Sequence, residues 1–281
     1  MTDAGDEPLE LRLSSWAMPT GSGDRWPRDY ERGRPGWPSE VVDVPGLPPT
    51  ATVLELGAGT GKLTRLLVRT FERVVAVEPA EPMRRLLAAF CPEAEALEGA
   101  AEEIPLEDGS VDGAFVAEAF HRFDHRQAVA ELARVLRPGG ALVLLWNLPA
   151  GPTEPSIAEA ERFLAARAPG GRAELGYDPL DLNTIVYESG AWRAAFAGSP
   201  FEPLREARLP NPQTVDRDEL VAFFASMGWL ADLPDAERLT VLGELRSRLA
   251  DAEYLRLWET HIHWARLTEP WARPYRNVLV P

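Results

Sequence analysis

Three glycines stand at alternate positions where a strand-like segment gives way to a helix-like one. The run Leu56-Gly57-Ala58-Gly59-Thr60-Gly61 directly follows the apolar segment 51–56 and precedes a helical pattern that starts at Lys62. Glycine lets a backbone approach a ligand closely, and the N-terminus of a helix favours negative charge. Since one glycine would suffice for a tight turn, three of them indicate a loop that binds a ligand.

Two common ligands of glycine loops fit this spacing poorly. A nucleoside triphosphate loop needs G-x-x-x-x-G-K followed by Ser or Thr, but leucine stands at its first and last positions, Leu56 and Leu63. A dinucleotide loop has the pattern G-x-G-x-x-G, whose last glycine would fall at Lys62. The observed pattern, G-x-G-x-G, is one residue tighter. It excludes the triphosphate and weakens the dinucleotide without eliminating it.

An acidic residue, Glu78, follows the next strand-like segment, 74–77, roughly 20 residues after Gly57. At the end of a parallel strand beside the first, its carboxylate can accept hydrogen bonds from both hydroxyls of a ribose. The same negative charge disfavours a 2′-phosphate and therefore NADP. A positively charged nucleoside without phosphates suits both the tight loop and an acidic surrounding that includes Glu55.

These segments resemble, in order and spacing, the class I S-adenosylmethionine-dependent methyltransferases. The resemblance begins with Val53-Leu54-Glu55-Leu56-Gly57-Ala58-Gly59-Thr60-Gly61 and with Val75-Ala76-Val77-Glu78-Pro79 and Met83. It continues through Gly99-Ala100-Ala101-Glu102-Glu103-Ile104-Pro105, Phe120-His121-Arg122-Phe123-Asp124 and Leu136-Arg137-Pro138-Gly139-Gly140. Upstream, residues 30–38 resemble the N-terminal segment of the branch that methylates small molecules. Arg122 departs from that branch, which usually has an aromatic residue there.

The resemblance implies S-adenosylmethionine as the cofactor. The residues that it places around this cofactor are Tyr30, Arg34, Glu55, Gly57, Gly59, Gly61, Glu78, Met83, Ala101, Glu102 and Glu118. Met83 would touch the adenine, with Ala101 and Glu102 at its border, and Glu118 would lie beside the methionine part. By the same resemblance Tyr30 and Arg34 would fold over the cofactor, where Arg34 could hold the methionine carboxylate in a charge-assisted pair.

Methyl transfer from a sulfonium is an in-line displacement, so the enzyme must chiefly hold nucleophile, methyl carbon and sulfur collinear. A base is needed only where the acceptor loses a proton. His121, at the expected carboxyl edge of the sheet, is the one candidate, because histidine titrates near neutral pH. Packing or hydrogen bonding at the rim of a pocket is the other interpretation of His121, and it is the one we favour.

Two histidines and a carboxylate alternate near the C-terminus. If the segment 257–267 is extended, Glu259, His261 and His263 share one face, as in some metal sites. The opposite face carries Trp258, Thr260, Ile262 and Trp264. We therefore expect the polar face to be the wetter side of an outer strand and expect no bound metal.

The elements expected around these residues alternate between strand and helix. Strands are predicted at 51–56, 74–77, 111–117 and 141–146, and helices at 62–70, 82–90 and after Asp124, where Gln127 would complete a capping box. Right-handed crossovers then give an α/β fold with a doubly wound, mostly parallel sheet of the Rossmann-like methyltransferase type. Two amphipathic helices, 216–230 and 234–250, would follow. Their apolar stripe either packs on the sheet or forms a lid over the acceptor.

Composition excludes several classes of protein. With 281 residues, 45% of them hydrophobic and 26% charged, the chain is typical of a globular protein. A net charge of −15 argues against a nucleic-acid partner. No apolar run approaches the roughly 20 residues of a membrane span, and the acidic start, MTDAGDEPLE, differs from a secretory signal, so we expect a cytoplasmic protein without membrane contact. The single cysteine, Cys91, rules out an internal disulfide.

We therefore expect an enzyme in three parts: an N-terminal arm over residues 1–50, a cofactor-binding core over 51–150, and a segment, 151–281, that completes the sheet and supplies a helical lid. The expected function is methyl transfer from S-adenosylmethionine to a small-molecule acceptor. Two alternatives stay open, a nicotinamide-dependent oxidoreductase on the same sheet and a protein that binds S-adenosylmethionine without catalysis.

Overall fold

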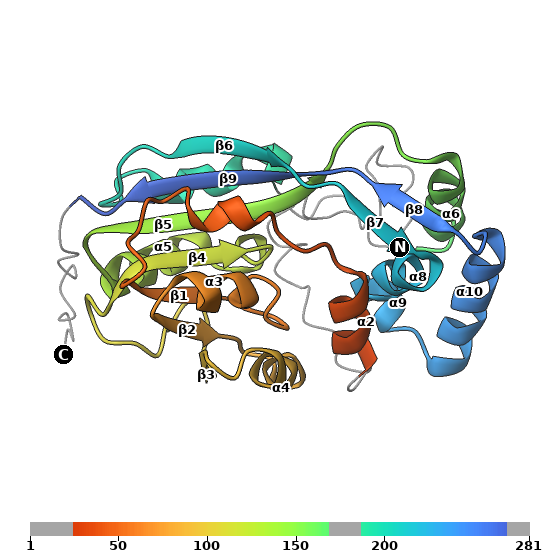
Figure 1. Cartoon of the computed structure of the whole chain (residues 1–281), viewed down its shortest axis with the longest axis horizontal. Helices are drawn as coiled ribbons and strands as arrows, with labels where there is room; N and C mark the ends of the chain where they lie inside the picture. The colour runs from red at the N-terminus through yellow and green to blue at the C-terminus, as the bar shows by residue number, and fades with distance from the viewer. Residues whose placement is uncertain (1–24, 169–186, 269–281) are drawn as a thin grey trace, which may run out of the picture.

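A seven-stranded sheet forms the centre of the computed structural model, which describes residues 25–168 and 187–268 (Figure 1). The strand order is β3-β2-β1-β4-β5-β9-β6. The strands are β1 Thr52–Leu56, β2 Arg73–Val77, β3 Glu95–Leu97, β4 Val111–Ala117, β5 Leu136–Pro149, β6 Arg205–Pro210 and β9 Trp258–Arg266. A separate antiparallel pair consists of β7 Gln213–Asp216 and β8 Glu253–Arg256.

The helices fall into two groups. Those that follow strands of the sheet are α3 Thr64–Thr70, α4 Glu81–Phe90 and α5 His125–Val135, with the short turn η2 Phe120–Arg122 before α5. Those that gather beyond the carboxyl ends of the parallel strands are α2 Arg25–Gly33, α6 Pro155–Ala165, α8 Arg217–Ala225, α9 Gly228–Ala231 and α10 Asp235–Arg248 (Figure 1). Two further short turns are η1 Ser39–Val42 and η4 Ala191–Phe196.

The strand pairing confirms the predicted doubly wound fold. Strand β1 pairs in parallel with β2 on one side and with β4 on the other, and β3 and β5 extend these two halves in parallel. Strand β9 then runs antiparallel to both β5 and β6. The chain thus moves outward from β1 to β3 and returns across β1 to β4. Open α/β sheets bind their ligands at such a switch, beyond the carboxyl ends of the strands.

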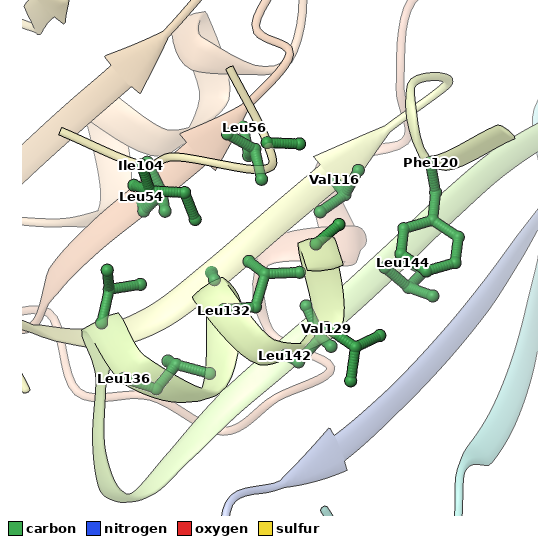
Figure 2. Packing of buried hydrophobic residues seen from close by; sticks show 14 of the residues in the cluster. Leu54, Leu56, Ile104, Val116, Phe120, Val129, Leu132, Leu136, Leu142 and Leu144 are labelled. Carbon is green, nitrogen blue, oxygen red and sulfur yellow. The ribbon is translucent and has the colours of Figure 1, made fainter. Parts of the chain in front are cut away.

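Apolar side chains from α5 pack on one face of the sheet (Figure 2). Val129 and Leu132 of α5 belong to the same buried cluster as Leu54 of β1 and Leu144 of β5. The predicted cap at Asp124 is present, because its Oδ1 accepts a hydrogen bond of 3.0 Å from the Gln127 backbone N–H. The predicted capping box is not formed, because the Asp124 N–H donates to Glu102 and the Gln127 side chain donates to Asp124 Oδ2. On the opposite face, a second cluster joins α3 and η1 to β1, β4 and β5. Both faces of the sheet are therefore covered.

The predicted helix over 216–230 is interrupted. Helix α8 ends at Ala225, and Met227 is extended before α9 begins at Gly228. The Ser226 hydroxyl donates to the Phe223 carbonyl oxygen at 2.7 Å, which satisfies a carbonyl at the end of α8. The apolar stripe of these helices packs into a core of its own with α6, α10 and Tyr254.

Helix α2 of the N-terminal arm docks on this helical group. Arg25 of α2 forms an ion pair with Asp235 of α10 at 3.1 Å. The buried guanidinium of Arg238, also in α10, pairs with Asp29 of α2. Arm and C-terminal helices thus form one packed layer at the carboxyl ends of the strands.

The prediction that Glu259, His261 and His263 lie on the wetter side of an outer strand is wrong. Strand β9 lies between β5 and β6, and the residues His261 and His263 are 9% and 1% exposed. The Tyr187 hydroxyl contacts His261 Nδ1 at 2.7 Å and His263 Nε2 at 3.0 Å, while Glu259 contacts His261 Nε2 at 2.7 Å. The two histidines are thus buried and bonded to Tyr187, while Glu259 is partly exposed, and burial lowers the pKa of His263 to about 4.

The described residues include neither a membrane-spanning helix nor a candidate metal centre. No helix in residues 25–168 and 187–268 has the length and apolar character needed to cross a bilayer. No group of three or more histidine, cysteine, aspartate or glutamate side chains in the same residues could hold a metal ion.

Candidate cofactor site

The three glycines of the loop share a backbone conformation but differ in the space around them. All three have positive φ angles: 74° at Gly57, 58° at Gly59 and 87° at Gly61. A Cβ on Gly57 would lie 2.6 Å from Ala119 Cβ, and one on Gly61 would lie 2.8 Å from Leu87 Cδ1. In front of Gly59 the nearest atom would be Cε1 of Tyr30, at 3.9 Å. The centre of the loop therefore leaves room on the side where Tyr30 lies.

Glu78 joins the second strand to this loop. Its carboxylate Oε2 accepts a hydrogen bond of 2.8 Å from the Gly59 N–H, and Oε1 accepts one of 2.9 Å from the Ala80 N–H. The side chain is 4% exposed, and burial raises its pKa while the two backbone N–H groups lower it. Glu78, the residue predicted to bind the ribose, thus lies next to the glycine loop.

Helix α2 is fastened to the loop by Glu31, a residue that the sequence analysis did not single out. Its carboxylate accepts hydrogen bonds from Thr60 Oγ1 at 2.6 Å and from Arg65 Nη2 at 2.8 Å. These bonds place Tyr30, the preceding residue, over Gly59. A threonine within a glycine loop and an acid beside the predicted Tyr30 were the available signals, but neither indicated a partner.

Arg34 presents an open guanidinium fork at the end of α2. Its Nε donates to Ser226 Oγ at 2.8 Å, and its Cζ lies 5.6 Å from the Tyr30 ring centre and 5.1 Å from that of Phe223. Within the described residues, its two terminal nitrogens donate no hydrogen bond. The head group is thus held by one bond and two rings, with two donors in the geometry that a carboxylate accepts.

Glu118 directly follows β4 and has a backbone conformation that residues with a side chain rarely adopt. Among the described non-glycine residues it alone has a positive φ, 50°. Its Oε1 accepts a hydrogen bond of 2.6 Å from the backbone N–H of Asn147 in β5. Strained backbone of this kind persists only where the surrounding structure fixes it, and it is concentrated at functional sites.

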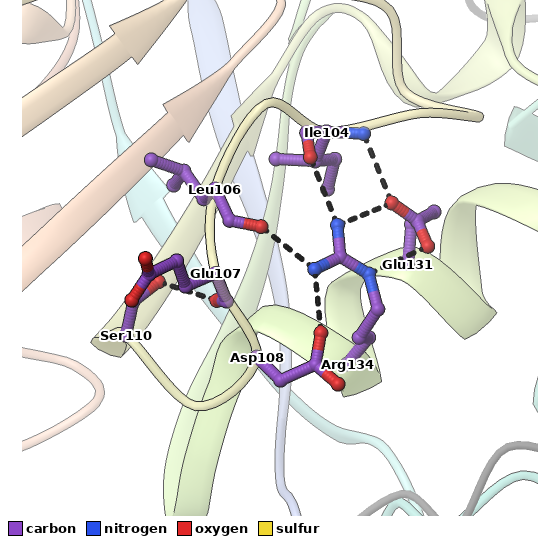
Figure 3. A network of polar contacts seen from close by, with 7 residues as sticks. All are labelled: Ile104, Leu106, Glu107, Asp108, Ser110, Glu131 and Arg134. Atoms are coloured by element: carbon purple, nitrogen blue, oxygen red, sulfur yellow. Dashed lines mark hydrogen bonds and ion pairs between the residues drawn. The ribbon is translucent and has the colours of Figure 1, made fainter.

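The segment that carries Ala101 and Glu102 is held by Arg134 of α5 (Figure 3). Arg134 Nη2 donates to the Ile104 carbonyl at 2.8 Å, Nη1 donates to the Leu106 carbonyl at 2.7 Å, and both Nε and Nη2 pair with Glu131. These partners raise the pKa of Arg134 above its ordinary value, with Glu131 the largest cause. Ala101 is buried, and Glu102 Oε1 accepts from the Asp124 N–H at 2.8 Å.

Comparison with known proteins decides the family. A family model for a methyltransferase domain matches residues 54–144. An uncharacterized methyltransferase-like protein of Schizosaccharomyces pombe is 33% identical over 222 residues, which are 77% of this chain and 81% of that protein. The chain belongs to the class I S-adenosylmethionine-dependent methyltransferases. Their cofactor is S-adenosylmethionine.

Other relatives of this methyltransferase agree over shorter or more divergent stretches. An uncharacterized methyltransferase of Mycobacterium tuberculosis is 55% identical over 120 residues, which are 42% of this chain and 49% of that protein. The chain thus spans about half the length of that relative. A solved structure of a candidate type II methyltransferase from Anaeromyxobacter dehalogenans has a TM-score of 0.60 at 24% identity, covering 83% of this chain and 98% of that one. That likeness shows the fold.

Two predicted cofactor contacts of the methyltransferase make other contacts in this structure. Met83 is 2% exposed and packs in a cluster with Trp26 and Ala231. The Glu55 carboxyl is 2% exposed and accepts a hydrogen bond of 2.5 Å from Thr64 Oγ1. Burial raises the pKa of Glu55 to about 8. Both residues lie next to elements of the site, and a direct contact with the cofactor stays a prediction for each.

His121 lies in η2, directly beyond β4. Burial is the main cause that holds the pKa of His121 well below its ordinary value, and the charges of Arg122 and Arg34 add to it. Its buried Nδ1 has no hydrogen-bond partner among the described residues. Burial lowers the pKa of the neighbouring Arg122, and the charges of Arg34 and Glu78 also act on that pKa, so Arg122 lies near the site. The imidazole is therefore neutral at pH 7, and a catalytic role for it stays a prediction.

Proposed function

We propose that this methyltransferase transfers the methyl group of S-adenosylmethionine to a small-molecule acceptor by in-line displacement. The observation that carries the proposal is the position of Glu78, whose carboxylate lies between the glycine loop and the start of α4: Oε2 accepts from the Gly59 N–H and Oε1 accepts from the Ala80 N–H. A ribose over Gly59 would bring its hydroxyls to that carboxylate, and the tight loop demands no phosphate. In this proposal Gly57 and Gly61 shape the loop, and Ala101 and Glu102 border the adenine.

The methionine end of the cofactor has a carboxylate and an ammonium group, and the chain offers a charge for each. The open fork of Arg34 suits the carboxylate, and Glu118 at the end of β4 suits the ammonium group. Tyr30 would lie over the bound molecule, since it stands in front of Gly59. In this proposal each of the two charged groups at the methionine end thus faces a side chain of opposite charge.

Catalysis in this proposal depends mainly on positioning. Holding the reactants in line can lower a barrier by roughly 7–11 kcal/mol. The neutral state of His121 leaves it able to accept a proton, but its low pKa makes it a weak base, so the proposed acceptor needs little activation. We assign residues 51–150 to cofactor binding, the arm 1–50 to covering the cofactor, and the helices within 151–281 to the acceptor side.

The names of two relatives give the kinds of acceptor that similar proteins methylate, an acyl group on a carrier protein and a quinone. A malonyl-acyl-carrier-protein O-methyltransferase of Methylococcus capsulatus is 45% identical over 103 residues, which are 34% of this chain and 37% of that protein. A demethylmenaquinone methyltransferase of Thermus thermophilus is 36% identical over 116 residues, which are 39% of this chain and 53% of that protein. Neither match reaches the whole chain, so the acceptor itself is not assigned. The cytoplasmic location expected from the sequence likewise stays a prediction.

Titration calorimetry with S-adenosylmethionine and S-adenosylhomocysteine tests the proposal. The wild-type chain should bind both, and Glu78→Ala should raise both dissociation constants at least about tenfold, since about 1.4 kcal/mol of ribose binding is lost. Turnover over an acceptor panel, followed as S-adenosylhomocysteine produced, then separates catalysis from binding alone. An absence of heat with either nucleoside, together with enhanced NADH fluorescence, would favour the oxidoreductase instead.

A further inference from the structure

The backbone carbonyl of Gly36 in the arm accepts hydrogen bonds from three amide side chains that are distant from it in the sequence. Its oxygen accepts hydrogen bonds from Asn211 Nδ2 at 2.9 Å, Asn147 Nδ2 at 3.1 Å and Gln213 Nε2 at 3.2 Å. The Gly36 N–H in turn donates to Gln213 Oε1 at 3.3 Å. We call Gly36 with these three amide side chains the amide cluster. It fastens the arm to β5, to β7 and to the segment between β6 and β7.

The interior of the amide cluster leaves it little freedom. Asn147 Oδ1 accepts from Thr260 Oγ1 at 2.5 Å and from Asn211 Nδ2 at 3.0 Å. The side chains of Asn147, Asn211 and Thr260 are 4%, 8% and 0% exposed. Buried amides are costly when unpaired and rigid when every group is satisfied. The cluster therefore defines one position for the Gly36 peptide.

Asn147 also reaches the opposite side of the cofactor site. Its backbone N–H donates to Glu118 Oε1 at 2.6 Å, while its side chain holds Gly36. Gly36 lies two residues beyond Arg34, and on the other side of Arg34 the backbone of Gly33 packs directly on that of Phe223. Arg34 is thus held on both sides along the chain, by Gly33 before it and by Gly36 after it. Asn147, which binds Gly36, also binds Glu118.

We propose that Asn147 is a positioning residue that sets the spacing between the Arg34 fork and the Glu118 carboxylate. This inference rests on the proposed function, in which those two groups bind the carboxylate and the ammonium group of the methionine end. Asn147 need not touch the cofactor. Its amide side chain fixes the position of Gly36 in the arm, and its backbone N–H fixes the position of the Glu118 carboxylate.

Asn147→Asp tests the inference, because it keeps the size of the side chain and replaces the donor to Gly36 with an oxygen that repels the carbonyl. Two ligands serve as probes: S-adenosylhomocysteine, and 5′-methylthioadenosine, which has the same nucleoside but no amino-acid end. The variant should raise the dissociation constant of S-adenosylhomocysteine about tenfold and change that of 5′-methylthioadenosine less than about twofold. Glu78→Ala is the matched control, since loss of a ribose contact should weaken both ligands alike.

A second variant, Gln213→Met, removes one donor of the amide cluster at a less buried position and leaves Asn147 intact. It should likewise weaken binding of S-adenosylhomocysteine more than binding of 5′-methylthioadenosine, with a smaller rise, about threefold, in the dissociation constant of S-adenosylhomocysteine. It decides the matter if Asn147→Asp fails to fold. Equal losses of affinity for both ligands, or no loss for either, would overturn the inference. The proposed function would still stand in that case, provided that the wild-type chain binds the ligands. If the wild-type chain binds neither ligand, the proposed function itself fails.

Discussion

Gly33 of α2 and Phe223 of α8 touch backbone to backbone. A Cβ placed on Gly33 would lie 2.0 Å from the Phe223 backbone nitrogen and 2.4 Å from the Ala222 carbonyl carbon. Real Cβ atoms do not come so close, and backbone atoms cannot turn aside as a flexible side chain can. The glycine therefore serves the close approach of two helices, and this approach sets where the arm meets the C-terminal helices.

Gly33→Ala should move α2 away from α8 and carry Tyr30 and Arg34 with it. Overpacking of this kind costs roughly 1–3 kcal/mol of folding free energy. We expect a lower melting temperature and a loss of S-adenosylhomocysteine affinity of at least about tenfold. Thermal unfolding and titration calorimetry measure the two effects.

Gly243→Ala is the matched control for that substitution. Gly243 lies within α10, and no atom stands within 4 Å of the Cβ that alanine would add. Because alanine favours helix over glycine by about 1 kcal/mol, this variant should be slightly more stable than the wild type and bind the cofactor equally well. Similar behaviour of the two variants would mean that the contact with Phe223 does not hold the arm.

Arg134→Met should destabilise the fold and loosen the adenine side of the proposed site. The residue is 9% exposed. Its loss removes the donors to the carbonyls of Ile104 and Leu106 and the guanidinium donors to the Glu131 carboxylate, which keeps the hydrogen bond from the Ile104 N–H. Breaking a buried pair by removing one partner costs about 3–5 kcal/mol. Urea denaturation gives the loss of stability, and calorimetry should show weaker binding of both S-adenosylhomocysteine and 5′-methylthioadenosine.

A second arginine in the same region provides the comparison for Arg134. Arg137 pairs with Asp112 at 2.6 Å, but its side chain is 44% exposed. Exposed ion pairs contribute about 0–1 kcal/mol, so Arg137→Met should leave stability and binding nearly unchanged. An equal cost for both arginines would argue against the network in Figure 3 as the support of Ala101 and Glu102.

The central strands could be predicted from the sequence because buried parallel strands read as short apolar runs bounded by turn residues. Strand β4 has the predicted bounds, Val111–Ala117, and β1 and β2 differ from prediction by one residue. Strand β5 extends beyond both ends of the predicted strand 141–146 and includes Pro138-Gly139-Gly140. The chain stays in the sheet through a register shift between Val111 and Gly113, with Gly139 at a φ of 78°.

Contacts between distant segments were beyond prediction. Glu31 reaches Thr60, and Asn147 reaches Gly36, across long stretches of chain, and no local pattern marks either pair. The same limit explains the error at His263. Alternation along β9 showed that the histidines share a face, but only the sheet order reveals that β6 pairs along the far side of β9. Sequence patterns fix which way a side chain points more readily than what covers it.

Glu55 is a buried acid whose titration should be visible in folding stability. Its pKa is raised from 4.5 to about 8, mainly by burial, so the folded chain keeps a proton that the unfolded chain releases. The contribution of Glu55 is fully present below pH 4.5 and is lost as the pH rises toward 8. Within that window the free energy of unfolding should fall by up to about 1.4 kcal/mol for each pH unit because of this one group.

Glu55→Gln removes the titration and keeps an oxygen that can accept from Thr64 Oγ1. Urea denaturation at pH 5.5, 6.5 and 7.5 should show that the variant becomes steadily more stable than the wild type as the pH rises, since all other groups titrate in both. The same variant separates the two roles open to Glu55. If the acid only joins β1 to α3 beneath the loop, S-adenosylhomocysteine binds the variant as tightly as it binds the wild type, because the hydrogen bond to Thr64 survives. If the acid contacts the cofactor directly, the dissociation constant rises. A stability difference that does not change with pH would show that Glu55 is already ionised in the folded protein at pH 5.5.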